Sequence, residues 1–286
     1  MILTGTGIID SHITYVVPPL DSYGGADTAY SLRKLRTAYA GSSIRVRRSS
    51  DNVEQDIGFV GVNLDTGSLL DFVDGGNAFV VTFYDQSGNG YNMTQGSATS
   101  QPQIVSAGVV LTKNGRPSML FDGTNDYFAN GSQRFSASQM TSFYAAQNLS
   151  PYNYGGIITS KQAGIDNSSA LDWEGGNGKL ETIFMNPISV FQTARQDALF
   201  IGNSAILDTG GTDLVQAWTN NVSDGTSTGA FPSRSPASVT WMGTYRTNET
   251  VLSGRFYLSE FFNYFSDQTS NRSAISSNMN SYYGTY

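Results

Sequence analysis

Carboxylates, an amide and a tryptophan gather in the segment 171–184, and residues of these types could bind a sugar. Sugar sites combine an aromatic ring, which lies against the apolar face of the sugar, with a few hydrogen-bonding groups. Two alternatives stay open, namely a tryptophan buried at a corner of the fold and a glutamate that is solvated in mid-strand. The pattern predicts a glycan-binding site made of Asp172, Trp173, Glu174, Asn177 and Glu181.

A second set of carboxylates lies in two turns rich in Gly and Asn, 84–92 and 121–128. Asp85, Asp122 and Asp126 could ligate Ca²⁺, which binds carboxylate and carbonyl oxygens from loops. Their spacing fits no EF-hand, and Asp or Asn in a turn commonly accepts hydrogen bonds from the amides of that turn. We therefore expect no metal and no other cofactor, with calcium as the alternative.

Composition excludes several kinds of chemistry. The chain has no cysteine, so it can form no disulfide, thiolate nucleophile or Cys-zinc site, and a single histidine, His12, argues against a histidine-based triad. A formal net charge of −7 argues against nucleic acid. No apolar run approaches the roughly 20 residues of a membrane span, and the first residues lack the pattern of a signal peptide. We expect no membrane insertion, and a location on a virion surface or otherwise outside cells without a classical signal peptide.

The elements that must position these residues are mostly strands. Short apolar runs closed by Gly, Pro or Asn recur along most of the 286 residues, which is typical of a sandwich or barrel. The run 78–84 is apolar without alternation and predicts a central strand. Helices are predicted over 28–39 after Asp27, over 68–73, and after Ser266 or Asp267 at the C-terminus. We expect one domain, 20–286, preceded by an arm or docking segment, 1–19, that ends at a Pro pair.

Several motifs resemble known families. The segments 121–127 (Phe-Asp-Gly-Thr-Asn-Asp-Tyr) and 256–260 (Phe-Tyr-Leu-Ser-Glu) resemble the concanavalin A-like lectin/glucanase, or laminin G-like, jelly rolls. The segments 36–41, 46–51, 84–90 and 171–184 resemble the catalytic domain of the arabinofuranosidase B family, glycoside hydrolase family 54. The resemblance implies an all-β, concanavalin A-like β-sandwich (jelly roll) with a few short peripheral helices.

The same resemblance implies a site. Glu181 matches the family's nucleophile, and a retaining glycosidase needs a second carboxyl about 5–5.5 Å away. The family carries its acid/base aspartate in a Gly-Gly-Asp-Asn stretch before the last long strand. The corresponding run here, 242–247, has no carboxyl, and the next one is Glu249. The family's adjacent cysteine pair has no counterpart either, because the chain has no cysteine.

These departures favour a non-enzymatic virion surface protein, such as a phage head fibre, capsid decoration or tail adhesin, with a lectin-like, glycan-binding domain. Its expected partners are other virion proteins, reached through Met1–Val17, and host-surface or mucosal glycans, with homo-oligomerisation as a further possibility. The alternative is an arabinofuranosidase-like retaining glycoside hydrolase with Glu181 as nucleophile and Glu249 or Asp172 as the relocated acid.

Overall fold

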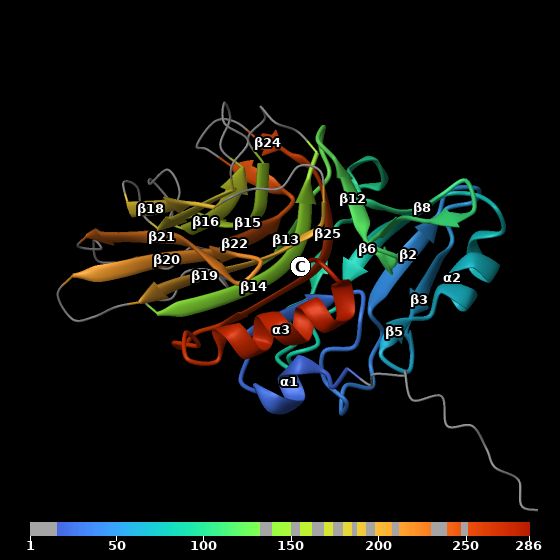
Figure 1. Ribbon diagram of the computed structural model, residues 1–286. Coiled ribbons are helices and arrows are strands. Elements are labelled where there is room, and N and C mark those ends of the chain that lie inside the picture. The colour runs from blue at the N-terminus through green and yellow to red at the C-terminus, as the bar shows by residue number, and fades with distance from the viewer. Residues whose placement is uncertain are drawn as a thin grey trace, which may run out of the picture.

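The computed structural model describes residues 16–131, 139–149, 155–161, 169–173, 180–184, 188–192, 198–207, 212–229, 239–246 and 251–286. Antiparallel strands make up most of its regular structure, and the helices are short and peripheral (Figure 1). This confirms the predicted all-β class. Most of the strands pair into one hydrogen-bonded network that forms two facing layers and a smaller group beside them.

The upper layer of Figure 1 carries three of the predicted sugar-binding residues, Asp172, Trp173 and Glu181. Residues on its inner side, such as Ile158, Leu171 and Val190, are buried in the core. Its strands follow one another in this spatial order: β7 (Met93–Thr94), β13 (Phe128–Asn130), β22 (Val239–Met242), β15 (Gly155–Lys161), β16 (Ser169–Trp173), β17 (Leu180–Phe184) and β18 (Ile188–Phe191).

The lower layer is organised around its longest strand, β25 (Arg255–Tyr264). One edge of β25 pairs first with β12 (Met119–Asp122) and then with β1 (Thr28–Ser31). The other edge pairs with β14, so β25 is central. Beyond β25 the layer continues through β14 (Met140–Asn148), β19 (Phe200–Leu207), β20 (Asp213–Thr219) and β21 (Val222–Gly229).

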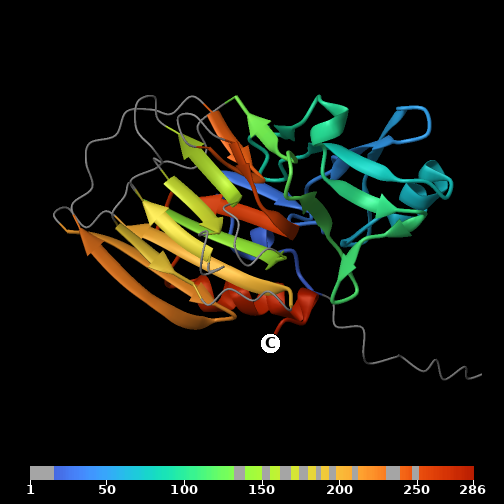
Figure 2. The same ribbon diagram turned by 90° about the horizontal axis from the view of Figure 1, so that it is seen from above.

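A third group of strands bridges the two layers, because β6 pairs with β7 while β8 pairs with β12. It appears to the right in Figures 1 and 2. Its strands are β3 (Glu54–Ile57), β2 (Ile44–Arg48), β6 (Ala78–Phe83), β8 (Gln103–Ser106) and β9 (Val109–Val110), and helix α2 (Thr66–Val73) packs beside them. The remaining elements are α1 (Pro19–Ser22), η1 (Ala98–Ser100), and the pairs β4 (Phe59–Val60) with β5 (Asn63–Leu64), β10 (Thr112–Lys113) with β11 (Arg116–Pro117), and β23 (Thr244–Arg246) with β24 (Val251–Ser253).

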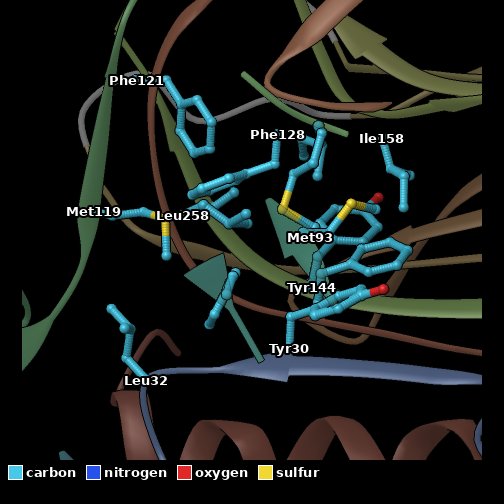
Figure 3. Close-up of a cluster of buried hydrophobic side chains, with 14 of the residues drawn as sticks. Tyr30, Leu32, Met93, Met119, Phe121, Phe128, Tyr144, Ile158 and Leu258 are labelled. Atoms are coloured by element: carbon cyan, nitrogen blue, oxygen red, sulfur yellow. The ribbon is translucent and has the colours of Figure 1, made fainter. Parts of the chain in front are cut away.

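The main core fills the space between the layers with aromatic and aliphatic side chains (Figure 3). Phe121 stacks on Phe256 with ring centroids 4.5 Å apart and meets Phe128 edge-on at 5.9 Å. Burying a large apolar side chain contributes about 1.5–3 kcal/mol. Val80 and Phe83 of β6 are fully buried, so the prediction of a central strand here is confirmed.

A second core lies under the outer face of the lower layer, where helix α3 (Arg272–Tyr283) covers it (Figure 1). The predicted apolar stripe of this helix is confirmed, since its members Ile275, Met279, Tyr282 and Tyr283 are buried. The predicted start is wrong: the helix begins after Asn271. Ser266 and Asp267 precede it in a separate turn, where Asp267 Oδ1 accepts from Thr269 N at 2.8 Å.

A buried ion pair anchors the chain between this core and β25. Glu260 is fully buried and accepts hydrogen bonds from Arg33 Nε at 2.7 Å and Nη2 at 3.0 Å. Tyr283 OH on α3 and Ser31 Oγ on β1 donate to the same carboxylate, at 3.0 and 2.8 Å. The ion pair is therefore fully hydrogen-bonded, which a buried charge requires.

The predicted helix over 28–39 is wrong, because the chain forms β1 there and continues irregularly. Ala29, Leu32 and Leu35 of its predicted apolar stripe are buried, but Ala38 is exposed, and the strand at its start pairs with β25. Gln86 supplies the hydrogen bonds that a helix would have made: its Oε1 accepts from Leu35 N at 2.8 Å, and its Nε2 donates to the carbonyls of Ser31 and Arg33. Tertiary pairing outweighs local periodicity here.

The predicted arm, 1–19, lies mostly outside the described residues, which begin at 16. Val16 packs on the second core, and Val17 O accepts from Asn278 Nδ2 at 2.7 Å. The arm stays a prediction. No helix among the described residues is long and apolar enough to cross a membrane.

Candidate active site

Two of the predicted site residues, Asp172 and Glu181, are register partners on neighbouring strands β16 and β17. Leu171, Leu180 and Thr182, which flank them in the chain, are buried in the core. Because successive residues of a strand alternate between faces, Asp172 and Glu181 belong to the outer face of the upper layer. Directly opposed residues of an antiparallel pair have Cβ atoms about 4.5–5.5 Å apart. The backbone therefore brings two carboxylate residues together on one surface.

The strand beside Asp172 presents a glycine at the matching position, Gly156. The register of β15 shifts between Gly156 and Ile158, and both Ile157 and Ile158 are buried. A Cβ at position 156 would lie 2.6 Å from Thr244 O and 2.6 Å from Thr159 Cγ2, so no larger residue fits without movement. Gly156 is itself buried, with Thr244 and Thr159 packed closely against it beside the position of Asp172.

A second glycine, Gly243, lies beside Gly156 and is also buried. Its amide donates to Gly156 O at 2.9 Å, and its φ of +98° is favoured only by glycine. A Cβ there would come within 2.4 Å of the Phe121 ring. The run 242–247, which lacks the carboxyl expected from the family resemblance, is thus packed closely against Gly156 and Phe121 through Gly243.

An aromatic residue that the sequence analysis did not single out, Trp241, lies on the same face. Thr240 and Met242 on either side of it are fully buried in the core, while Trp241 is half-buried. It pairs with Thr159 of β15, whose hydroxyl donates to Thr244 O at 3.0 Å. The sequence pattern does not indicate this outward tryptophan, because the apolar residues Val239 and Trp241 share the outer face while the polar Thr240 is buried.

The predicted glycan-binding cluster is divided in the structure. Trp173 follows Asp172 directly in β16 and pairs with Leu180, so these two positions belong to opposite faces of the layer. Glu174, Asn177 and the alternative acid Glu249 lie outside the described residues. The described part of the cluster on the outer face is Asp172 with Glu181.

The three calcium candidates hold turns together by accepting backbone hydrogen bonds. Asp85 Oδ1 accepts from Ala29 N and Ser87 N, both at 2.9 Å, and its Oδ2 accepts from Tyr91 N at 3.0 Å. Asp122 Oδ1 accepts from the amide of residue 124 at 2.7 Å, and Asp126 Oδ2 accepts from Asp122 N at 2.9 Å. In the described ranges, no group of three or more His, Cys, Asp or Glu residues could hold a metal ion.

Asp126 differs from the other turn carboxylates in its environment. It is 5% exposed, and its burial, together with the nearby charge of Asp122, raises the pKa of its carboxyl to about 7. The hydrogen bond from Asp122 N opposes this shift. Its main-chain carbonyl lies close to Gly243, so this turn packs against that glycine.

Comparison with known proteins identifies the fold. The family described as "Alpha-L-arabinofuranosidase B, catalytic" matches residues 19–203, more than half of the chain. A GH54 α-L-arabinofuranosidase soaked with a cyclic sulfate inhibitor superposes with a TM-score of 0.60 at 13% identity, over 92% of this chain and 65% of its own. An arabinofuranosidase complexed with arabinofuranosyl-α-1,2-xylobiose gives 0.56 at 16% identity, over 92% and 64%.

A third solved structure, a glutamate-to-glutamine mutant of a GH54 enzyme soaked with 4-nitrophenyl α-L-arabinofuranoside, gives a TM-score of 0.60 at 14% identity, over 92% of this chain and 65% of its own. The chain thus spans slightly less than two thirds of the length of these structures. Among curated proteins the search found no match.

These matches overturn one interpretation of the sequence. A non-enzymatic virion surface protein is contradicted, because the family and the similar structures are glycoside hydrolases and nothing in them supports a phage head fibre, capsid decoration or tail adhesin. The acid missing from the run 242–247 does not exclude hydrolysis, because Asp172 lies directly across from Glu181 on the neighbouring strand. The match over residues 19–203 shows that the chain belongs to the α-L-arabinofuranosidase B catalytic-domain family.

Proposed function

We propose that the protein is a retaining glycoside hydrolase that removes α-L-arabinofuranosyl groups, with Glu181 as nucleophile and Asp172 as general acid/base. The observation that carries the proposal is the register of β16 and β17, in which these two residues are direct partners. Membership of the arabinofuranosidase B family supports the reaction class.

The spacing of the pair supports retention of configuration. Retaining glycosidases hold their carboxyls about 5–5.5 Å apart, whereas inverting enzymes need about 6.5–9.5 Å to admit a water molecule. Directly opposed strand residues have Cβ atoms about 4.5–5.5 Å apart, which puts the shorter separation within reach of their carboxyl groups. Two carboxyls suffice for this chemistry, so we expect activity that does not depend on an added metal.

The reaction would run in two steps. Glu181 attacks the anomeric carbon as its bond to the leaving oxygen breaks, and Asp172 donates its proton to that oxygen. The arabinofuranosyl group is then an ester of Glu181. Asp172, now ionised, takes a proton from water as the water oxygen attacks the anomeric carbon, which releases the sugar and restores both residues.

The pair also suggests a pH profile. The active form needs one ionised and one protonated carboxyl. We therefore expect a bell-shaped dependence of kcat/KM on pH, whose two limbs belong to the pair and not to either residue alone.

The substrates bound in similar structures suggest where to begin. One of those enzymes was soaked with 4-nitrophenyl α-L-arabinofuranoside, and another was complexed with arabinofuranosyl-α-1,2-xylobiose. We propose that this chain acts on arabinofuranosyl groups carried by pentose glycans. An extracellular location would suit such substrates.

The test is release of 4-nitrophenol from the aryl arabinofuranoside by the whole chain. Glu181→Gln should lower kcat by more than about 1,000-fold, and Asp172→Asn by about 100- to 10,000-fold. Glu54→Gln is the matched control, because Glu54 lies exposed on β3 in a loose surface pair, 3.8 Å from Arg45. Hydrolysis by Glu181→Gln at the wild-type rate would refute the assignment.

A chemical rescue identifies the nucleophile more directly. Azide is small enough to occupy the space that Glu181→Ala leaves and can attack the anomeric carbon itself. A single displacement inverts the centre, so the expected product is the β-arabinofuranosyl azide. Failure of azide to restore any turnover, or formation of the α-azide, would contradict the role of Glu181.

A further inference from the structure

A groove opens beside the third group of strands, outside the candidate active site. One wall is the segment 63–70, which holds β5 and the start of α2, and the other is the segment 108–117, which holds β9, β10 and β11. Figure 1 shows α2 and β5 on this side of the molecule. The volume of the groove is about 550 Å³, which lies within the range of about 300–1,000 Å³ that is usual for binding clefts.

The walls of the groove carry apolar side chains that stay in contact with solvent. Leu70 is 36% exposed and Val109 is 66% exposed, while Val110 and Pro117 are half-buried. Arg116 is the one charged residue among the described residues that line the groove. Exposed apolar surface of this kind marks interaction sites, and here it fits an apolar partner that carries at most a negative charge.

The described part of the chain begins close to this groove. Val17 O accepts a hydrogen bond from Asn278 Nδ2 on α3 at 2.7 Å. Four residues further along α3, a rise of about 6 Å, Tyr282 OH donates to Asn63 Oδ1 at 3.0 Å, and Asn63 lines the groove. The segment 1–15, which lies outside the described residues, therefore joins the described chain about one helical turn from the groove.

The composition of the segment 1–15 matches the groove. Asp10 is its only carboxylate, and it has no Lys or Arg. Its large aliphatic residues are Ile2, Leu3, Ile8, Ile9 and Ile13. Ile9 is seven residues before Val16 in the chain, and seven extended residues span up to about 25 Å. The central isoleucines are therefore within reach of the groove.

We propose that the segment 1–15 binds in this groove of its own chain, with its isoleucines against Leu70 and Val109 and with Asp10 toward Arg116. Covering the two exposed aliphatic side chains removes apolar surface from water, which favours the bound arm. A short covalent connection gives the arm an effective concentration in the millimolar range, so the groove is filled even if the contact is weak. The inference does not depend on the proposed function.

Site-specific cross-linking of the whole chain tests the proposal. Because the chain has no cysteine, Ser11→Cys provides a single site for benzophenone maleimide. After irradiation, peptide mass spectrometry should place the cross-links in the segments 63–70 or 108–117 of the same chain. Adding Ile8→Asp together with Ile9→Asp should reduce these cross-links at least about fivefold, because two apolar contacts are lost. Thr4→Asp together with Thr6→Asp is the matched control, since it adds the same charge at polar positions of the arm and should keep most of the cross-links.

A change in the groove itself should have the same effect. Val109→Asp should reduce the cross-links at least about fivefold, whereas Val222→Asp, at a position 68% exposed on β21, should leave them unchanged. Thermal unfolding confirms that both variants are folded. Cross-links between two chains, recognised by mixing protein of normal and heavy isotopic composition, would show that the arm binds a second copy and would overturn the proposal. Cross-links to other segments, no cross-links, or full cross-linking in the Ile8→Asp, Ile9→Asp and Val109→Asp variants would overturn it as well.

Discussion

Replacing Gly156 with alanine tests how tightly the backbone is packed beside the carboxylate pair. The added Cβ would lie 2.6 Å from both Thr244 O and Thr159 Cγ2, well inside van der Waals contact. Overpacking of this kind costs about 1–3 kcal/mol of unfolding free energy. Part of the clash is with a backbone carbonyl, which cannot rotate away, so we expect β15 to shift against β16.

The shift should affect catalysis more than stability. Gly156 pairs directly with Asp172, and a misplacement of about 1 Å at a reacting group costs about 100-fold in rate. We therefore expect Gly156→Ala to lose about 1–3 kcal/mol in urea unfolding and about 100-fold in kcat on the aryl arabinofuranoside.

Gly58→Ala is the control, because a Cβ there meets nothing within 4 Å. It should change neither quantity by much and is expected to stabilise by up to about 1 kcal/mol, since alanine restricts the unfolded chain. Wild-type stability together with wild-type kcat in Gly156→Ala would refute the packing argument. Lost stability with full activity would refute the link between this strand and the reacting groups.

Three further predictions concern the scaffold. The pKa of Asp126 is raised to about 7, so its contribution to stability is complete below the unfolded pKa and is lost as pH rises through about 7. In denaturant unfolding, the free energy of unfolding of Asp126→Asn should match that of the wild type near pH 4 but exceed it by up to about 4 kcal/mol near pH 8. Parallel pH curves for the two proteins would contradict this. Glu260→Gln leaves the buried Arg33 without its counter-charge and should cost about 3–5 kcal/mol, measured by thermal unfolding; a loss below about 1 kcal/mol would show that the ion pair is not needed. Asp85→Ala removes the acceptor for three backbone amides and should lower the free energy of unfolding by at least about 2 kcal/mol. It should leave KM for the aryl substrate unchanged, and an altered KM would assign this turn to the site.

Much of the fold could be predicted from the sequence because apolar runs and turn residues report directly on strands. The run 78–84 has no polar alternation, and β6 is indeed central. The prediction of a helix over 28–39 failed for a physical reason. The helical spacing of its apolar residues was real, but the side chains of Asp85 and Gln86, more than fifty residues away, accept hydrogen bonds from its amides. Contacts between residues so far apart in the chain leave no pattern in the local sequence.

The candidate site, like the fold, could be predicted from the sequence only in part. Asp172 and Glu181 could be singled out by type, but that they are partners follows from the register of β16 against β17, which spacing alone does not fix. Glu249 and Asp172 were both candidates for the second carboxyl, and only the strand register places Asp172 directly opposite Glu181. Trp241 was missed because its neighbours in sequence are buried and its neighbours on the surface come from other strands.

Covalent labelling tests the central claim most directly. A cyclic sulfate inhibitor, of the kind soaked into one similar enzyme, should react with the catalytic nucleophile, and peptide mass spectrometry then locates the modified residue. We predict one label per chain, on Glu181, that competes with substrate and is absent from Glu181→Gln. A label on another carboxylate would contradict the assignment of Glu181 and Asp172 as the catalytic pair. So would wild-type protein that takes up no label from the inhibitor and yet hydrolyses the substrate at full rate.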